Sequence, residues 1–193
     1  MLSRHGPSGP RLDCAPVTVL SREELRAALA ADPPLVEDVD EGAQLQPNGV
    51  DLRIERVQRF TSPGVLGAAD GAREPAARED VPPDADGWWD LPPGAYVIGY
   101  RERVNLPNGV MAFARPRSSL LRSGIAVHTA VWDAGYSGRG EGLLSVLNPG
   151  GYRLQRGARV VQLVFLRLGR EAAEGYRGRY QGEGDLSVME PRD

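Results

Sequence analysis

The sequence predicts a mainly β fold, and two observations favour that class. Six short runs rich in β-branched and aromatic residues follow one another in the second half of the chain, and each is bounded by Gly, Pro or Asn. Short strands at such close spacing are typical of an antiparallel sandwich or barrel and not of alternating βαβ units. The length of 193 residues suits one domain with a core of ordinary size.

The first predicted element is a short helix that follows a turn-rich segment. Residues 1–13 carry few apolar side chains, so we expect a flexible N-terminal tail there. Ser21 and Glu24 form the pattern of a capping box, and Leu20 and Leu25 occupy the two positions of a hydrophobic staple. A helix of about three turns is therefore expected after Ser21, and its role is packing.

A strand is predicted next, followed by a long excursion. Val50 and Leu52 begin an alternation of apolar and polar residues directly after a Pro-Asn-Gly turn. Residues 61–90 are rich in Ala, Asp, Gly, Pro and Glu with little apolar pattern, which predicts a surface excursion closed by Trp88 and Trp89.

The remaining strands and a C-terminal arm complete the predicted domain. The six β-like runs are Ala95–Tyr100, Gly109–Arg115, Gly124–Trp132, Gly142–Asn148, Tyr152–Gly157 and Ala158–Leu168. The β domain is thus expected over residues 14–175. Residues 176–193 contain little apolar sequence, so they form either an arm that closes over a ligand or a frayed tail.

Composition excludes several classes of protein. The net charge of −3 and the pI of about 5.5 argue against a broad basic face for nucleic acid. All 23 basic residues are Arg. A single cysteine, Cys14, and two histidines, His5 and His128, provide neither a disulfide framework nor a Cys/His zinc site, which excludes the zinc-dependent nucleobase deaminases. The chain has no secretory h-region and no apolar run long enough to span a membrane, so we expect a cytoplasmic protein without a membrane partner.

The segment PRSSLLRSG has the composition of an anion site. Arg117, Ser118, Ser119 and Arg122 combine guanidinium groups with short hydroxyls, which suits a polyphosphate because arginine pairs with phosphate oxygens in a fork. The alternative is a capped helical turn whose arginines are solvated.

Two acidic residues and two polar strand residues are further candidates. Asp133 ends an apolar run before a glycine turn, so it serves either as a partly buried general base or as a turn former; Asp51, at a strand start, has the same alternative. Tyr136 either presents its ring to a sugar or lies at a sheet rim. Arg159 and Gln162 are three apart in a strand, so they reach one ligand only at a bend or across a subunit boundary.

The order of these motifs resembles the deoxyuridine triphosphatase and dCTP deaminase superfamily, particularly its archaeal-type branch. The segments that carry the resemblance are NGVDL (48–52), PRSSLLRSG (116–124), TAVWDAGYSGRG (129–140), RVVQL (159–163) and YQGEG (180–184). The resemblance implies a distorted β-barrel or jelly roll that forms a homotrimer, with three active sites at the subunit interfaces.

The resemblance also implies a role for each candidate residue. Asp133 activates water for attack on the α-phosphorus, Tyr136 lies beneath the deoxyribose, and Asp51 lies near the shell of a Mg²⁺ ion that bridges the phosphates. The residues that would hold the triphosphate or belong to the closing arm are Arg117, Ser118, Ser119, Arg122, Arg159, Gln162, Tyr180, Gln181 and Gly182.

One departure from the superfamily decides between two activities. Relatives that deaminate dCTP carry a glutamate three residues before an asparagine, whereas this chain has Ser145 before Asn148. A hydroxyl is a poor proton shuttle at neutral pH, and Glu141 is placed in the preceding turn. The expected function is therefore Mg²⁺-dependent hydrolysis of dUTP to dUMP and pyrophosphate, which keeps uracil out of DNA; a dCTP deaminase or a non-catalytic nucleotide-binding trimer are the alternatives.

Overall fold

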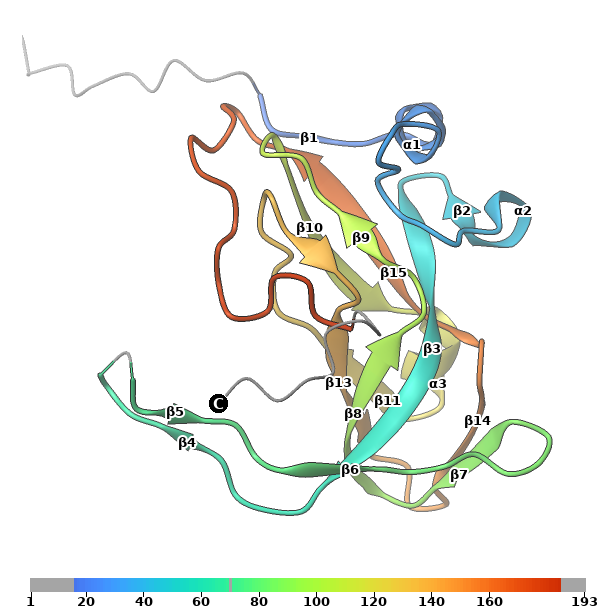
Figure 1. Ribbon diagram of the computed structural model, residues 1–193. Helices are drawn as coiled ribbons and strands as arrows, with labels where there is room; N and C mark the ends of the chain where they lie inside the picture. The colour runs from blue at the N-terminus through green and yellow to red at the C-terminus, as the bar shows by residue number, and fades with distance from the viewer. Residues whose placement is uncertain (1–15, 70, 185–193) are drawn as a thin grey trace, which may run out of the picture.

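A computed structural model describes residues 16–69 and 71–184 and has the mainly β architecture that the sequence predicts (Figure 1). The predicted tail at residues 1–13 lies outside the described residues. The described residues form three helices, α1 (Arg22–Leu29), α2 (Glu41–Gln44) and α3 (Ser118–Arg122). The strands of the described residues are β1 (Thr18–Val19), β2 (Leu45–Gln46), β3 (Gly49–Phe60), β4 (Val65–Leu66), β5 (Arg73–Glu74), β6 (Arg78–Asp80), β7 (Trp88–Leu91), β8 (Gly94–Tyr100), β9 (Val104–Asn105), β10 (Val110–Pro116), β11 (Ile125–His128), β12 (Ser137–Gly138), β13 (Glu141–Val146), β14 (Tyr152–Gln155) and β15 (Arg159–Arg167).

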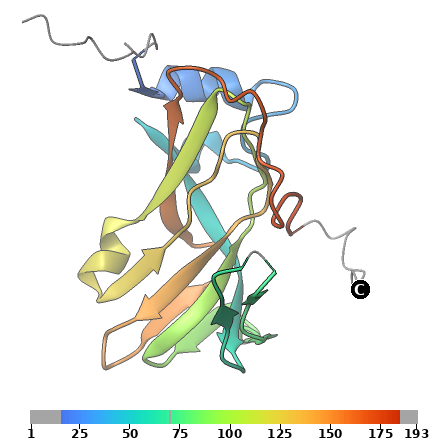
Figure 2. The ribbon, with the colours of Figure 1, turned by 90° about the vertical axis from the view of Figure 1, so that its left-hand side faces the viewer.

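The principal sheet curls around the long strand β3. The strand order is β1-β15-β3-β8-β13-β11, all antiparallel, and β10 pairs with the other edge of β15. The first half of β3 pairs with β15 and the second half with β8, so this strand belongs to both halves of the sheet. Figures 1 and 2 show β3 running diagonally through the molecule at this corner.

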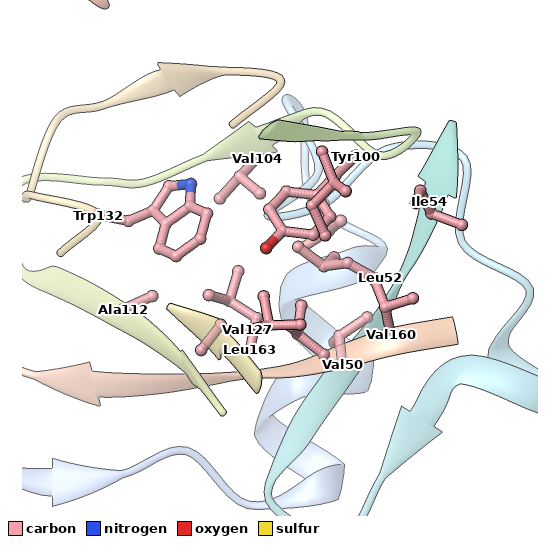
Figure 3. Packing of buried hydrophobic residues seen from close by; sticks show 14 of the residues in the cluster. Val50, Leu52, Ile54, Tyr100, Val104, Ala112, Val127, Trp132, Val160 and Leu163 are labelled. Atoms are coloured by element: carbon pink, nitrogen blue, oxygen red, sulfur yellow. The ribbon is translucent and has the colours of Figure 1, made fainter. Parts of the chain in front are cut away.

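Side chains from both halves of the curled sheet fill the core. Val50 and Leu52 of β3, Tyr100 of β8 and Leu163 of β15 lie together with Trp132 in Figure 3. The rings of Tyr100 and Trp132 are tilted with centroids 6.1 Å apart. The apolar residues Val50, Leu52, Ile54 and Val57 that predicted β3 are all buried, and Gly49 and Asp51 beside them are buried as well.

The predicted capping box of helix α1 is confirmed. The Ser21 side chain accepts a hydrogen bond from the backbone of Glu24, and the Ser21 amide donates to the Glu24 carboxylate at 2.8 Å. Leu20 and Leu25, the staple positions, are both buried. The carboxylate of Glu24 also accepts from Arg167 at 3.0 Å, which ties the helix to the end of β15.

We expect Ser21→Ala to lower the free energy of unfolding by about 1 kcal/mol, because the substitution leaves a helix N-terminal amide without its side-chain acceptor. Urea denaturation of the variant and the parent protein measures the difference. An unchanged unfolding midpoint would show that the capping box does not stabilise the fold.

The excursion at residues 61–90 contains more regular structure than its composition predicts. Strands β4 and β5 form a hairpin that protrudes from the body, with Leu66 82% exposed. Strand β6 pairs with the end of β3, and β7 pairs with β14. Trp89 is buried and its indole N–H donates to the carbonyl of Val81 at 2.7 Å, so the excursion is anchored at both ends.

Candidate active site

A pocket of about 180 Å³ opens where the segment after β11 meets the C-terminal arm. The Asp133 pocket, as we call it, is lined by Ala130, Val131, Trp132, Asp133, Tyr136, Gly140, Glu141, Tyr176, Tyr180 and Glu183. Two sequence-predicted residues, Asp133 and Tyr136, therefore line one cavity with Tyr180 of the predicted arm.

The backbone beside Asp133 is held by an isolated pairing with β10. The amide of Trp132 donates to the carbonyl of Ala112 at 2.8 Å, and the reverse bond is 2.9 Å. The Asp133 side chain is exposed, and the regular strand β11 already ends at His128. Of the two alternatives for Asp133, the turn is present, since the Tyr136 amide donates to the Asp133 carbonyl at 3.1 Å, and the role of general base stays a prediction. Within residues 16–69 and 71–184, no side chain is hydrogen-bonded or ion-paired to the Asp133 carboxylate. Within these residues, the carboxylate oxygens are therefore open to hydrogen bonds from a ligand or water.

Tyr136 is covered by the arm of its own chain. Its side chain is buried, its hydroxyl donates to a carboxylate oxygen of Glu183 at 2.9 Å, and its ring meets the ring of Tyr176 edge-on at 5.9 Å. A Cβ atom at Gly138 would lie 2.7 Å from the Tyr136 hydroxyl, so only glycine fits there. Burial is the main cause that raises the pKa of Tyr136 above its usual value, and the charge of Glu183 adds to it.

Backbone and side-chain bonds dock the arm onto the segment 135–139. The Gln181 side chain accepts from the Ser137 amide and donates to the Gly135 carbonyl, both at 3.0 Å. The Gly182 amide donates to the Ser137 carbonyl at 2.8 Å, and the amide of Arg139 donates to the Glu183 carbonyl at 2.8 Å. The predicted arm residues are therefore brought next to Asp133 within one chain.

The basic residues predicted to hold phosphate gather around a buried carboxylate. Asp51 is 2% exposed, and its Oδ2 lies 3.4 Å from Arg117 Nε and 3.3 Å from Arg159 Nη1. Gln46 donates to the same oxygen at 3.3 Å. Burial raises the pKa of Asp51, while the two guanidinium groups oppose the rise. Asp51 thus holds the guanidinium groups of Arg117 and Arg159 close to each other.

Arg159 and Gln162 lie on the same side of β15, which the regular alternation of a strand forbids. The pairing of β15 with β3 shifts between Arg159 and Val161, so Val160 is an extra, bulged residue. Val160 and Val161 are both buried, whereas Arg159 and Gln162 are both partly exposed. The bend that was one of the two predicted alternatives is therefore present, and Gln162 is the register partner of Asp51.

The segment PRSSLLRSG forms α3 with its polar side chains outward. Ser118, Ser119 and Arg122 are exposed, and Leu120 is buried. Arg117 precedes the helix and makes no capping bond. The helical turn that was the structural alternative is thus present, and it displays the hydroxyls and guanidinium groups required of an anion site. We call Arg117, Ser118, Ser119, Arg122, Arg159 and Gln162 the basic cluster.

The basic cluster and the Asp133 pocket do not meet within one chain. Trp132 pairs with Ala112, and Arg117 lies five residues further along the extended β10, so about 16 Å separates the two places along the strand. Figure 2 shows α3 on one side of the molecule and the arm on the opposite side. A site that uses both groups needs a second copy of the chain.

Comparison with known proteins identifies the family. A family model described as dCTP deaminase-like matches residues 19–168. The chain belongs to the dCTP deaminase-like family. The resemblance drawn from the five motifs is confirmed.

Several relatives with curated names cover most of the chain. A protein of Methanococcoides burtonii named probable deoxyuridine 5'-triphosphate nucleotidohydrolase is 44% identical over 168 residues, which are 86% of this chain and 99% of the relative. A protein of Archaeoglobus fulgidus with the same name is 42% identical over 167 residues, 86% of this chain and 98% of the relative. The crystal structure of 2'-deoxycytidine 5'-triphosphate deaminase from Agrobacterium tumefaciens matches with a TM-score of 0.60 and 22% identity; the match covers 78% of this chain and 49% of that one, and it concerns the fold alone.

Two residues bear on deamination in this family member, Glu141 and Ser145, and the structure places the first of them differently from the prediction. Glu141 is the first residue of β13 and does not lie in the preceding turn. Its carboxylate is held by Arg56 at 2.7 Å and by Arg78 of the excursion at 2.6 Å. Ser145 lies further along β13, opposite Ala126 of β11. Both carboxylate oxygens of Glu141 are thus engaged by arginines, so Glu141 is poorly placed to replace the missing glutamate.

His, Cys, Asp and Glu side chains are the groups of this chain that could bind a metal ion. Among residues 16–69 and 71–184, no group of three or more His, Cys, Asp or Glu side chains could hold a metal ion. The Asp51 carboxylate accepts hydrogen bonds from Arg159 and Gln46 and is ion-paired with Arg117. The described residues of one chain therefore provide no set of three such protein ligands for a resident metal ion.

Sequence reasoning missed Glu183 and the two arginines on Glu141. Burial is the main cause that raises the pKa of Glu183 from its usual 4.5 to about 7, the nearby charge of Glu141 adds to the rise, and hydrogen bonding from Tyr136 opposes it. The one sequence signal was the place of Glu183 inside the motif YQGEG. Arg56 and Arg78 carried no signal, because their contact joins residues 63 and more positions apart.

We expect docking of the arm to weaken as the pH rises through about 7. In the docked arm Glu183 is buried and has a raised pKa, so its neutral form favours docking. This stabilisation is complete below the ordinary pKa of about 4.5 and is lost as the pH rises through the raised value. The amide resonances of Gly182 and Arg139 report docking in a titration from about pH 5.5 to about pH 8.5.

Two variants test this titration. Glu183→Gln keeps an oxygen that accepts from Tyr136 but cannot ionise, so we expect its arm to stay docked across the range. The control is Glu174→Gln, which alters an exposed arm carboxylate that pairs with Arg177 and should leave the titration unchanged. The explanation is wrong if Glu183→Gln titrates as the parent does.

Proposed function

We propose that this member of the dCTP deaminase-like family is a dUTP diphosphatase that hydrolyses dUTP to dUMP and pyrophosphate. The observation that carries the proposal is the Asp133 carboxylate, which has no side-chain partner among residues 16–69 and 71–184, in a pocket that Tyr136 also lines. Relatives at 42–44% identity that are named probable deoxyuridine 5'-triphosphate nucleotidohydrolase support the same substrate. Ser145 in place of a glutamate, and the arginine clamp on Glu141, argue against deamination as the alternative.

The proposed reaction assigns one chemical step to Asp133. A water molecule donates a hydrogen bond to the Asp133 carboxylate, which takes its proton as the water oxygen forms a bond to the α-phosphorus. The bond from that phosphorus to the oxygen bridging to the β-phosphorus breaks, and its electron pair leaves with pyrophosphate. The product at the pocket is dUMP.

The basic cluster is proposed to bind the triphosphate. Guanidinium groups pair with phosphate oxygens in a fork, and the exposed hydroxyls of Ser118 and Ser119 fill remaining acceptor positions. Asp51 is proposed to hold Arg117 and Arg159 in place, and its predicted position near the metal shell stays a proposal. Magnesium enters as part of the Mg–dUTP substrate and supplies charge neutralisation at the phosphates.

A homotrimer with sites between subunits is proposed because one chain separates its own basic cluster from its own Asp133. A neighbouring copy brings the two groups together, and cyclic symmetry repeats the site. Tyr136, Tyr180, Gln181 and Gly182 would then enclose the nucleoside while the neighbour holds the phosphates.

The cytoplasm is the proposed compartment, since deoxynucleoside triphosphates are made and consumed there. Within residues 16–69 and 71–184, every helix is too short and too polar to cross a bilayer.

Product analysis tests the assignment. The protein is incubated with dUTP, dCTP, dTTP and UTP, each with and without Mg²⁺, and dUMP, pyrophosphate and ammonia are measured. We expect pyrophosphate from dUTP and no ammonia from dCTP. Ammonia released from dCTP would favour the deaminase, and tight binding of dUTP without pyrophosphate would favour a non-catalytic nucleotide-binding trimer.

A further inference from the structure

A second, larger hollow lies between strands β3 and β8 and the end of the excursion, and its lining residues Arg139 and Gly184 are next in sequence to Gly140 and Glu183 of the Asp133 pocket. It measures about 610 Å³, which is within the range of about 300–1,000 Å³ typical of small-molecule sites. Four arginines line it, Arg56, Arg101, Arg139 and Arg156, against the two acidic residues Glu55 and Asp80. The chain as a whole has 23 basic and 26 acidic residues, so this arginine hollow is a local concentration of positive charge.

A β-bulge organises the arginines of the hollow. The pairing of β3 with β8 shifts between Ile54 and Arg56, so Glu55 is the extra residue. One Glu55 oxygen accepts from Arg101 Nε and the other from Arg156 Nε, both at 2.7 Å. Because a single carboxylate holds two guanidinium groups, the pair keeps a net positive charge.

Most donors of these two guanidinium groups are unused. Each guanidinium carries five N–H groups. Through the described parts of the chain, 16–69 and 71–184, the side chains of Arg101 and Arg156 have no hydrogen-bond partner except Glu55. Two fixed cations with spare donors beside a cavity are the arrangement that binds phosphate oxygens.

One wall of the hollow is apolar and comes from the excursion. Val81, Pro82 and Pro83 face the cavity together with Val57 of β3 and the edge of Trp89. Trp89 is held by its bond to Val81, so this wall is fixed. An anion that also carries a flat, weakly polar body matches this lining better than a bare ion does.

The hollow adjoins the docked arm. Arg139 and Gly184 both line it, and the Arg139 amide donates to the carbonyl of Glu183. A Cβ atom on Gly184 would lie 2.6 Å from the Cβ of Arg139, so the arm passes directly over this arginine. A ligand in the arginine hollow would therefore lie beside the docked arm at Gly184.

We propose that the arginine hollow is an accessory binding site for a polyphosphate group, carried by a nucleotide whose base packs on the wall formed by the excursion. The shared chemistry, a chain of phosphate oxygens on Arg101 and Arg156, is also offered by inorganic polyphosphate. The proposal is independent of the reaction at Asp133.

Calorimetric titration with ATP and with inorganic tripolyphosphate tests the proposal. The full chain and the variant Arg122→Gln, which alters the basic cluster, are both titrated. We expect one class of ATP binding that persists in Arg122→Gln and is at least about tenfold weaker in Arg156→Gln, a change equal to about 1.4 kcal/mol. Hydrolysis of dUTP should be unaltered in Arg156→Gln.

Matched controls separate the proposal from a change in folding. Arg153→Gln alters an exposed arginine that pairs with Asp84 and Asp90 outside the hollow, and it should bind ATP as the parent does. Arg101→Gln should repeat the loss seen for Arg156→Gln, with each variant's thermal unfolding recorded.

Three outcomes would overturn the accessory site. These are equal ATP affinity in Arg156→Gln and the parent, loss of all binding in Arg122→Gln, or loss in the control Arg153→Gln. Tripolyphosphate that binds as tightly as ATP would overturn the nucleotide as the source of the phosphates.

Discussion

Asp133→Asn is expected to lower the rate of dUTP hydrolysis by a factor of about 10² to 10⁴, the usual contribution of a positioned general base. An amide has the shape of a carboxylate but does not accept the proton of the attacking water. The Asp133 carboxylate has no partner in the part of the chain that the structure describes, so the substitution breaks no internal contact. We therefore expect nucleotide affinity to stay within about tenfold of the parent, or about 1.4 kcal/mol.

Steady-state kinetics and equilibrium binding of a non-hydrolysable dUTP analogue measure the two quantities separately. Asp90→Asn is the matched control, because Asp90 is an exposed aspartate that pairs with Arg153 far from the pocket. It should retain full turnover. Undiminished turnover in Asp133→Asn would show that another group accepts the proton.

Two inactive variants are expected to restore activity when their subunits are mixed. Arg122→Ala removes an exposed guanidinium proposed to bind phosphate, and such charged contacts are worth about 1.5–3 kcal/mol each. If a site takes Asp133 from one subunit and Arg122 from its neighbour, trimers assembled at random from equal amounts of the two variants hold both residues in about a quarter of their sites. Co-expression with two different affinity tags yields the mixed trimers for assay.

The size of the recovery distinguishes the two site architectures. Activity near a quarter of the parent level supports sites between subunits. Activity no higher than that of the separate variants would mean that each chain uses its own two groups, despite their separation along β10. A mixture of each variant with the parent protein gives the reference for subunit exchange.

The sequence predicted those features that depend on neighbouring residues. The capping box at Ser21 joins residues three apart, and the alternation of apolar and polar residues from Val50 to Ile54 is visible in consecutive residues, so both follow from local rules. The grouping of Gln181 with the segment after Asp133 came from the resemblance, and the arm bonds at Gly135 and Ser137 agree with it.

Long-range contacts explain what the sequence did not predict. The pKa of Glu183 is raised mainly because the fold buries its carboxyl group, and the nearby charge of Glu141 adds to the rise. The sequence left open whether Asp133 is partly buried or opens a turn; it is exposed, because β11 ends at His128 and an isolated bridge at Trp132 follows. A continuous apolar run does not reveal where regular pairing stops.

The bulge at Val160 has a consequence for how the chain tolerates change. At the present spacing of three residues, Arg159 and Gln162 share one side only while the extra residue stays out of the ladder. Deleting one of the two adjacent valines would leave the pair two residues apart, and regular alternation would keep both on the outer surface. A change that made the ladder regular at the present length would instead rotate Arg159 into the apolar interior. The chain should therefore tolerate the loss of one valine better than the loss of the bulge alone.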